Sequence, residues 1–153
     1  MSIQTRTATR NDLPTLLGFE QGIIVAERPY DSTLKPDPIS YYDLAELIAG
    51  ADSEVAVAVL DGVIVGSGSA QKKPSRHYTQ PEFHAHLGFM FVLPEYRGKG
   101  VNHLILDHLF SWARRQGLPE IRLTVYPDNE PAVKAYTKAG FAPHILEMRK
   151  RIT

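Results

Sequence analysis

Residues 94–101 read Pro94-Glu95-Tyr96-Arg97-Gly98-Lys99-Gly100-Val101 and separate two segments of different periodicity. Before them, residues 83–93 form an apolar run that predicts a buried strand ended by the proline. After them, apolar residues recur at helical spacing on one face, at Val101, Leu104, Ile105, Leu109 and Trp112. This change of period predicts a turn that connects a strand to a helix.

The composition of this turn suits a polyphosphate ligand. Gly98 and Gly100 allow the backbone to come close to a ligand and to adopt positive φ angles. The free N–H groups at the start of the helix point into the turn, where the helix dipole also favours an anion. Arg97 and Lys99 add two positive charges. The alternative is an ordinary tight turn whose charges are solvated.

Two familiar phosphate loops do not fit these residues. In a nucleotide P-loop a Ser or Thr that binds magnesium follows the lysine, whereas Lys99 is followed by Gly100 and Val101. A dinucleotide fingerprint requires a third glycine where this chain has His103, and it lies in an opening βαβ unit, not late in the chain. The ligand is therefore expected to be another phosphate compound.

The rest of the chain alternates short elements with turns. Two β-rich runs flank Asp61-Gly62, which is a strong hairpin signal. Strands are expected over residues 3–8, 54–60, 63–69, 83–93, 121–126 and 145–152. Residues 28–39, with three prolines, and the polar residues 71–80 are expected to be loops.

Capping residues mark the other predicted helices. Thr9, with Asp12 three residues later, begins a first helix that ends before Pro29. Ser40, followed by Asp43, is expected to cap a second helix that stops at Gly50, and a last helix spans residues 129–139. Hairpins followed by β-α-β units predict an α/β (α+β) fold with a mixed sheet and helices on both faces. We expect a single domain over residues 1–153.

Whole-chain composition narrows the function classes. Seventeen basic residues balance seventeen acidic ones, so no global field indicates nucleic acid or an anionic membrane as a partner. The chain has no cysteine, which excludes disulfides, thiolate metal sites and a cysteine nucleophile. No apolar run approaches the roughly 20 residues that cross a bilayer, and the N-terminus has no apolar signal segment. We expect a soluble, cytoplasmic protein.

Two motifs together resemble the GNAT family of N-acetyltransferases. The first is the family's acetyl-CoA motif, and the second is its Asn-x-x-Ala-x-x-x-Tyr-x-x-x-Gly-Phe segment. The first motif matches Val92, Pro94, Tyr96, Arg97, Gly98, Lys99 and Gly100; the second matches Asn129, Ala132, Tyr136, Gly140 and Phe141. The match in detail spans about residues 90–142. One position departs from it, because the family pattern places a small residue where this chain has Asn102.

The resemblance implies a cofactor site for acetyl-CoA. The family fold is a mostly antiparallel sheet in which two parallel strands, here residues 83–93 and 121–126, splay apart around the thioester. Backbone groups of one strand would pair with the pantetheine, and the turn would hold the pyrophosphate. The expected contacts are Met90, Phe91, Val92, Arg97, Gly98, Lys99, Gly100, Val101, Asn102 and Asn129. The Asn102 side chain would either crowd the pyrophosphate or contact it through its amide, and Asn129 would contact the pantetheine, cap the last helix or do both.

The same resemblance suggests catalytic groups. The counterpart of Tyr136 lies near the sulfur of CoA, and a phenol with a pKa of about 10 is protonated at neutral pH and can act as a general acid. Otherwise its ring only packs on the sheet. His84 and His86 project from one face of the strand and are candidate bases, or ordinary sheet residues if water carries the proton. No metal is expected, because nothing fixes a third ligand beside these two histidines.

The acceptor is expected to be a primary amine of a small molecule, amino acid or peptide, which attacks the thioester directly in a ternary complex. In the family the first two helices and their loop form the acceptor wall. Candidate contacts there are Glu27 for a cationic amine, Arg28 for a carboxylate, and Tyr30. Two alternatives remain, a module that binds acyl-CoA without transferring it, and a longer acyl donor. Family members often dimerise, so a homodimer is possible, but no residue decides it.

Overall fold

The computed structural model describes residues 2–153. Its internal contacts divide the chain into two compact units, Met1–Leu123 and Thr124–Thr153. Each unit is described by itself.

The first unit contains a five-stranded sheet in the order β1-β2-β3-β4-β5. Its strands are β1 (Gln4–Thr7), β2 (Ser53–Leu60), β3 (Val63–Pro74), β4 (Phe83–Val92) and β5 (Ile121–Arg122). Neighbouring strands are antiparallel except for β4 and β5, which run parallel. This confirms the predicted mixed and mostly antiparallel sheet, and the Asp61-Gly62 hairpin joins β2 to β3 with positive φ at both residues.

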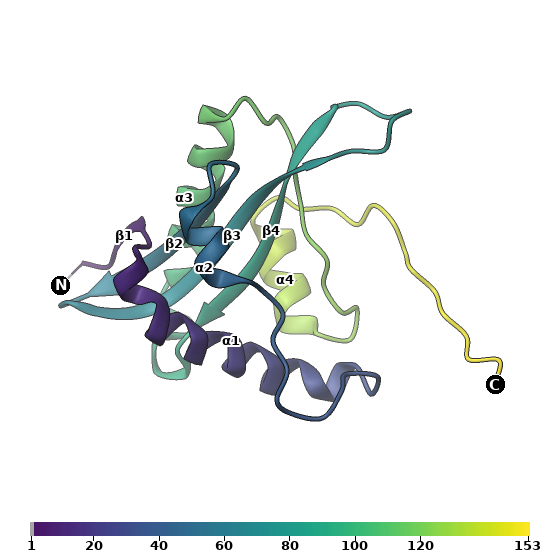
Figure 1. The fold of residues 1–153 in the computed structure, drawn as a ribbon, viewed down its shortest axis with the longest axis horizontal. Helices are drawn as coiled ribbons and strands as arrows, with labels where there is room; N and C mark the ends of the chain where they lie inside the picture. The colour runs from purple at the N-terminus through teal and green to yellow at the C-terminus, as the bar shows by residue number, and fades with distance from the viewer. Residues whose placement is uncertain (1) are drawn as a thin grey trace. The chain divides into compact units, whose positions relative to one another are not determined.

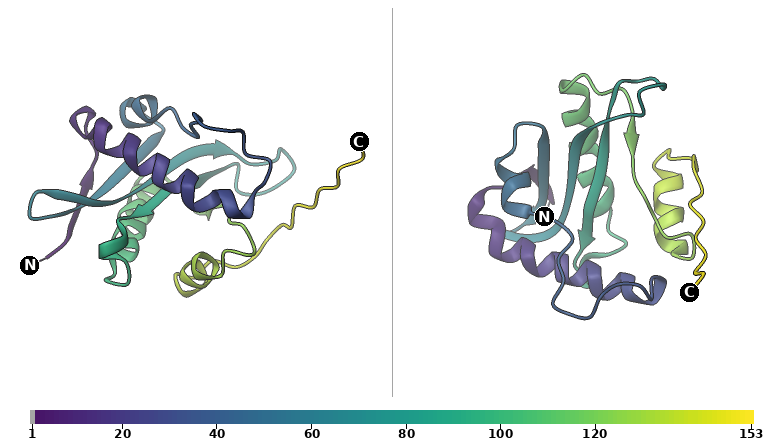
Figure 2. Two further views of the ribbon diagram at one scale, coloured as in Figure 1. Left: turned by 90° about the horizontal axis from the view of Figure 1, so that it is seen from below. Right: turned by 45° about the vertical axis from the view of Figure 1, so that its right-hand side comes forward.

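Helices cover both faces of this sheet, as predicted (Figures 1 and 2). On one face lie α1 (Leu13–Glu27) and α2 (Leu44–Ala49), and on the other lies α3 (Val101–Arg115). The core on the α1 side includes the buried side chains of Leu16, Phe19, Val57 and Phe89. Burial of these apolar side chains drives the helices onto the sheet.

Helix starts follow local capping chemistry. The capping box of Thr9 and Asp12 is present, but its first turn is a 3-10 helix, Arg10–Asp12, that leads into α1. The prediction that Ser40 caps the second helix was wrong. Asp43 is the cap, and its side chain accepts a hydrogen bond from the N–H of Glu46 (3.1 Å).

Three strand boundaries differ from the predictions. β3 continues through polar residues to Pro74, because β4 supplies ladder partners regardless of side-chain polarity. β5 is only two residues long. The predicted strand over residues 145–152 is absent, since no strand within residues 2–153 pairs with this segment, and its side chains are exposed.

The second unit is built around α4 (Glu130–Lys138). The side chain of Asn129 caps its start by accepting a hydrogen bond from the N–H of Ala132 (3.4 Å). At its end, Gly140 has φ 101°, and the N–H of Phe141 donates to the carbonyl of Tyr136 (3.0 Å). These features form a Schellman termination, and the rings of Tyr136 and Phe141 meet edge to face with centroids 5.8 Å apart.

Candidate active site

The glycine-rich turn has the predicted strand-to-helix geometry. After β4 the chain makes a short 3-10 turn, Pro94–Tyr96, and then enters α3 at Val101. Gly98 has φ 74° and Gly100 has φ 82°, the left-handed region that favours glycine. No side chain caps α3, and its first turn carries no acidic residue. The opening N–H groups of the helix and its positive dipole end therefore favour an external anion.

Positive side chains flank this turn at its surface. The Nε of Arg97 donates to the carbonyl of Val92 (3.0 Å), which holds the guanidinium beside the end of β4. The Nζ of Lys99 lies 5.6 Å from the centroid of the Tyr96 ring. Both Arg97 and Lys99 are exposed, and Asn102 is half-buried on the first turn of α3. The two positive side chains thus lie at the same place as the N-terminus of α3.

Pairing between the two parallel strands covers only the start of β4. The register joins Ala85 to Ile121 and His86 to Arg122, and it ends there. β4 itself continues to Val92, so its pairing with β3 outlasts its pairing with β5. The predicted strand at residues 121–126 therefore leaves β4 early.

The free stretch of β4 presents backbone groups at this edge. The N–H of Leu93 donates to the carbonyl of Val65 in β3 (2.9 Å). Because backbone direction alternates along a strand, the groups of Phe91 face β3, while those of Met90 and Val92 face the opposite edge. Within residues 2–153, no strand pairs with β4 beyond His86 on that side. This edge ends directly at the glycine turn.

A β-bulge interrupts β4 just before the free stretch. The register with β3 passes from Ser69 opposite Gly88 to Ser67 opposite Phe91. Phe89 lies inside the bulge with φ 56°, a strained value for a residue that is not glycine. A bulge bends its strand and increases the local twist, which accounts for the early end of the pairing with β5.

The two candidate bases differ in their surroundings. His84 is buried, and its Nδ1 lies 2.9 Å from the Oγ of Ser75, whereas His86 is half-buried. Burial and the nearby Arg122 charge lower the pKa of His84. Burial and the Lys73 charge lower the pKa of His86. Both imidazoles are therefore neutral, and able to accept a proton, at neutral pH.

The candidate acceptor contacts lie at the end of α1. Burial raises the pKa of the Glu27 carboxyl, opposed by a hydrogen bond from Tyr41. Arg28 already has a carboxylate partner within the chain, because its guanidinium contacts Asp37 at 2.7 Å. Tyr30 is exposed. A substrate carboxylate at Arg28, as predicted, would therefore have to compete with Asp37 for the guanidinium.

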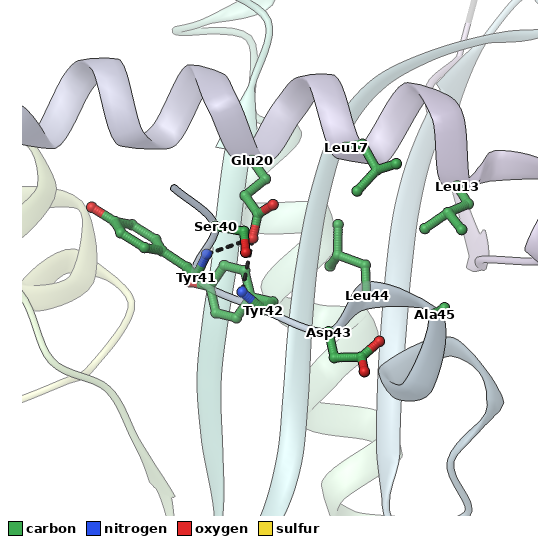
Figure 3. Close-up of a pocket in the computed structure, with 9 residues that line it drawn as sticks. All are labelled: Leu13, Leu17, Glu20, Ser40, Tyr41, Tyr42, Asp43, Leu44 and Ala45. Atoms are coloured by element: carbon green, nitrogen blue, oxygen red, sulfur yellow. Dashed lines mark hydrogen bonds between the residues drawn. The ribbon is translucent and has the colours of Figure 1, made fainter. Parts of the chain in front are cut away.

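A pocket of about 440 Å³ lies between α1 and the segment that leads into α2 (Figure 3). Glu20 of α1 is one of its lining residues and is only 1% exposed. The Glu20 carboxylate accepts hydrogen bonds from the backbone N–H groups of Tyr41 (2.9 Å) and Tyr42 (2.8 Å). These bonds keep residues 40–42 out of the helix, which explains the later cap of α2. The lining residues are Leu13, Leu17, Glu20, Ser40, Tyr41, Tyr42, Asp43, Leu44 and Ala45.

Sequence reasoning did not find Tyr42, although its hydroxyl contacts the backbone of the β4 bulge. No local motif marks this residue, because its partner is 47 positions away in the sequence. The remaining predicted residues, Tyr136 and Asn129, belong to the second unit, on α4 and at its cap. Among residues 2–153, no cluster of three or more His, Asp or Glu side chains could hold a metal, and none of the helices could span a membrane.

Comparison with known proteins gives a family match and several relatives. The model of the acetyltransferase (GNAT) family matches residues 22–141. The streptothricin acetyltransferase of Streptomyces lavendulae is 39% identical over 51 residues, which are 33% of this chain and 27% of that protein. The peptidyl-lysine N-acetyltransferase YjaB of Escherichia coli strain K12 is 38% identical over 56 residues, 37% of this chain and 35% of that protein. The chain thus aligns with about a third of each relative or less.

A solved structure shares the fold over nearly the whole chain. It is a predicted acetyltransferase with acetyl-CoA from Clostridium acetobutylicum, with a TM-score of 0.74 and 18% sequence identity. The alignment covers 97% of this chain and 96% of that one.

Proposed function

The chain belongs to the acetyltransferase (GNAT) family, and on that premise we propose that it transfers the acetyl group of acetyl-CoA to a primary amine. The observation that carries this proposal is the continuity of two features in the first unit. The free backbone edge of β4 leads directly into an uncapped helix start flanked by Arg97 and Lys99. A ligand with a peptide-like arm and a pyrophosphate needs these two features in this order.

The cofactor contacts follow from this order. The pyrophosphate is bound by the turn from Arg97 to Asn102, where the N–H groups of α3 and the two cationic side chains favour anions. The amides of the pantetheine arm pair with the backbone of Met90 and Val92, as an added strand would. Asn129 adds a side-chain contact to this arm, a role that rests on the family motif.

The reaction proceeds by direct attack in a ternary complex. The neutral amine nitrogen attacks the thioester carbonyl carbon, the C–S bond breaks, and the amine loses a proton. A backbone N–H at the β4 edge stabilises the negative charge on the carbonyl oxygen. Tyr136 donates its phenolic proton to the departing thiolate, a role that rests on the family motif. The phenolate left on Tyr136 then regains a proton from solvent, so the products are the N-acetylated amine and the free thiol of CoA.

His86 is the better placed of the two candidate bases. His84 is 7% exposed and its Nδ1 lies within hydrogen-bond distance of Ser75, whereas His86 is half-buried and its imidazole makes no hydrogen bond within residues 2–153. Its lowered pKa keeps it unprotonated at neutral pH. It takes the proton that the amine releases, directly or through one water molecule.

The acceptor is an amine of a small molecule, amino acid or peptide. Two curated relatives are named for acetylation of streptothricin and of peptidyl lysine, and both alignments are partial. Glu27 supports a cationic acceptor, since its carboxylate lies at the half-buried end of α1. Tyr30 and Arg28 complete this wall, and Arg28 contributes mainly by holding Asp37.

The test combines binding with turnover. Calorimetry with CoA measures the cofactor site, and thiol release from acetyl-CoA measures transfer across a panel of polyamines, aminoglycosides, amino acids and lysine peptides. We expect CoA binding and transfer to at least one primary amine. CoA binding without transfer to any amine would favour the alternative, an acyl-CoA-binding module in which Asn102 alters the phosphate site. No CoA binding would contradict both.

A further inference from the structure

The backbone of the β4 bulge at Phe89 is hydrogen-bonded by side chains and not by the backbone of a neighbouring strand. The N–H of Phe89 donates to the hydroxyl of Tyr42 (3.0 Å), and the carbonyl of Phe89 accepts a hydrogen bond from the hydroxyl of Ser67 (3.1 Å). Both backbone groups of the strained residue therefore have side-chain partners. Buried backbone groups without partners are costly, so these two hydroxyls determine which bulge geometry is stable.

Tyr42 is itself fixed from two directions. Its backbone N–H donates to the buried carboxylate of Glu20 in α1 (2.8 Å), which sets the position of its Cα. Its ring meets the ring of Phe89 edge to face, with centroids 5.7 Å apart. Its hydroxyl lies over Gly88, where a Cβ would come within 3.4 Å of it. The phenol is thus an anchored acceptor that lies within van der Waals distance of position 88.

The bulge determines the direction of the strand that follows it. Two residues of β4, Phe89 and Met90, lie opposite Gly68 alone, and this extra residue turns the groups of Met90 and Val92 toward the free edge. Without the bulge, alternation would reverse which groups face that edge. The geometry of Phe89 therefore controls the backbone groups that the proposed function assigns to the thioester and the pantetheine.

We propose that Tyr42 is a positioning residue for acetyl transfer, which holds the bulged backbone of β4 at Phe89 so that Met90 and Val92 face the thioester. The proposal rests on the proposed function. Hydrogen bonds join Glu20 of α1 to the segment before α2 at Tyr42 (Figure 3), and the Tyr42 hydroxyl in turn accepts a hydrogen bond from Phe89 of β4. Tyr42 remains a neutral hydroxyl, because burial raises its pKa above the ordinary value for a phenol.

The test removes only the hydroxyl, with Tyr42→Phe, and keeps the ring that packs on Phe89. Tyr78→Phe is the matched control, since its exposed phenol also accepts one hydrogen bond, from Arg76 (3.1 Å), in the loop after β3. The first measurement is amide hydrogen exchange at Phe89, followed by NMR in the absence of any ligand. We expect exchange to accelerate about tenfold or more in Tyr42→Phe and to stay unchanged in Tyr78→Phe. Unchanged protection in Tyr42→Phe would overturn the proposal whether or not the protein is an enzyme.

The second measurement is steady-state kinetics on the best amine acceptor, with CoA affinity from calorimetry. We expect kcat to fall about 10- to 100-fold in Tyr42→Phe, because small misplacements of reacting groups slow the chemical step, and the dissociation constant for CoA to rise by a smaller factor, because the turn assigned to the pyrophosphate keeps its contacts. Unchanged kcat would overturn the proposal. A loss of CoA affinity as large as the loss of kcat would also overturn it, because that result indicates a general structural role and not the positioning of the reacting groups. A wild-type protein that binds no CoA and acetylates no amine would contradict the proposed function instead.

Discussion

Replacement of Gly100 by alanine tests the phosphate turn most directly. Gly100 precedes α3 with φ 82°, and a Cβ built on it would meet no atom within 4 Å. The substitution therefore introduces backbone strain without a steric clash. An alanine in the left-handed region costs about 1–2 kcal/mol relative to an ordinary conformation. If binding requires the observed turn, that strain appears as a dissociation constant for CoA raised about 5- to 30-fold.

The same helix provides a matched control at its other end. Gly117 follows α3 with φ 71°, and it too has no atom within 4 Å of a built Cβ. Gly117→Ala therefore carries the same kind of strain at the other end of a 15-residue helix that is about 22 Å long, given the 1.5 Å rise per residue. Each variant should lose up to about 2–4 °C in melting temperature per kcal/mol of strain. Only Gly100→Ala should weaken CoA binding.

Calorimetry with CoA and thermal unfolding of both variants distinguish the outcomes. If the free Gly100→Ala protein keeps the turn in its observed conformation, the strain will lower the melting temperature. If the turn moves to relieve the strain, CoA binding must restore the conformation and will therefore be weaker. Equal CoA affinity in wild type and Gly100→Ala, with an equal melting temperature, would refute the role of this conformation. Equal loss of affinity in both variants would show that the effect is global.

Three further predictions concern protons. Tyr136→Phe should lower kcat by about 100-fold or more with CoA affinity unchanged, as expected for loss of a general acid, and unchanged turnover would exclude that role. Because burial and the Lys73 charge lower the pKa of His86, the pH profile of kcat/KM should fall on the acid side only below pH 6.5. The variant His86→Gln should lose this acid-side fall in kcat/KM. If the fall persists in the variant, water or another group is the base. The Arg6 guanidinium, bound at 2.8 Å, lowers the pKa of Asp12 from 3.8 to about 2. A lowered pKa in the folded state stabilises it above pH 3.8, and that stability is lost as the pH falls toward about 2. Urea unfolding should therefore show that Asp12→Asn lowers the free energy of unfolding by about 1–2 kcal/mol at pH 7, a modest value because solvent partly screens the exposed Arg6. This difference from wild type should shrink as the pH falls and Asp12 becomes protonated. An equal difference at all pH values would contradict the ion-pair account.

Local signals predicted the elements that depend on local chemistry. The glycine turn, the Asp61-Gly62 hairpin and the Asn129 cap all follow from conformational preferences or side-chain hydrogen bonds within a few residues. The family resemblance, carried by the turn and by the segment around Tyr136, agrees with the family match over residues 22–141. Such features need no knowledge of the tertiary fold.

Features that depend on distant partners could not be read from the sequence. The start of α2 moved to Asp43 because Glu20, more than twenty residues earlier, binds the backbone at Tyr41 and Tyr42. The bulge at Phe89 depends on hydroxyls from Tyr42 and Ser67, on two other segments. The alternating residues 145–152 fit a strand pattern, but a strand forms only when another strand supplies ladder partners.

The catalytic assignments remain predictions because they depend on the acceptor. Burial and hydrogen bonding favour His86 over His84, which the two-residue spacing alone could not decide. The ion pair of Arg28 with Asp37 reduces the case for a substrate carboxylate at that position. Charge patterns in a sequence identify candidate groups, while their partners in the fold determine which groups are available.

An unpaired strand edge is also a hazard for a protein in solution. The backbone of β4 at Met90 and Val92 offers donors and acceptors that any extended chain can match, including a second copy of this protein. A cofactor that occupies the edge competes with such pairing. Saturating CoA should therefore delay aggregation on heating by more than its effect on melting temperature explains.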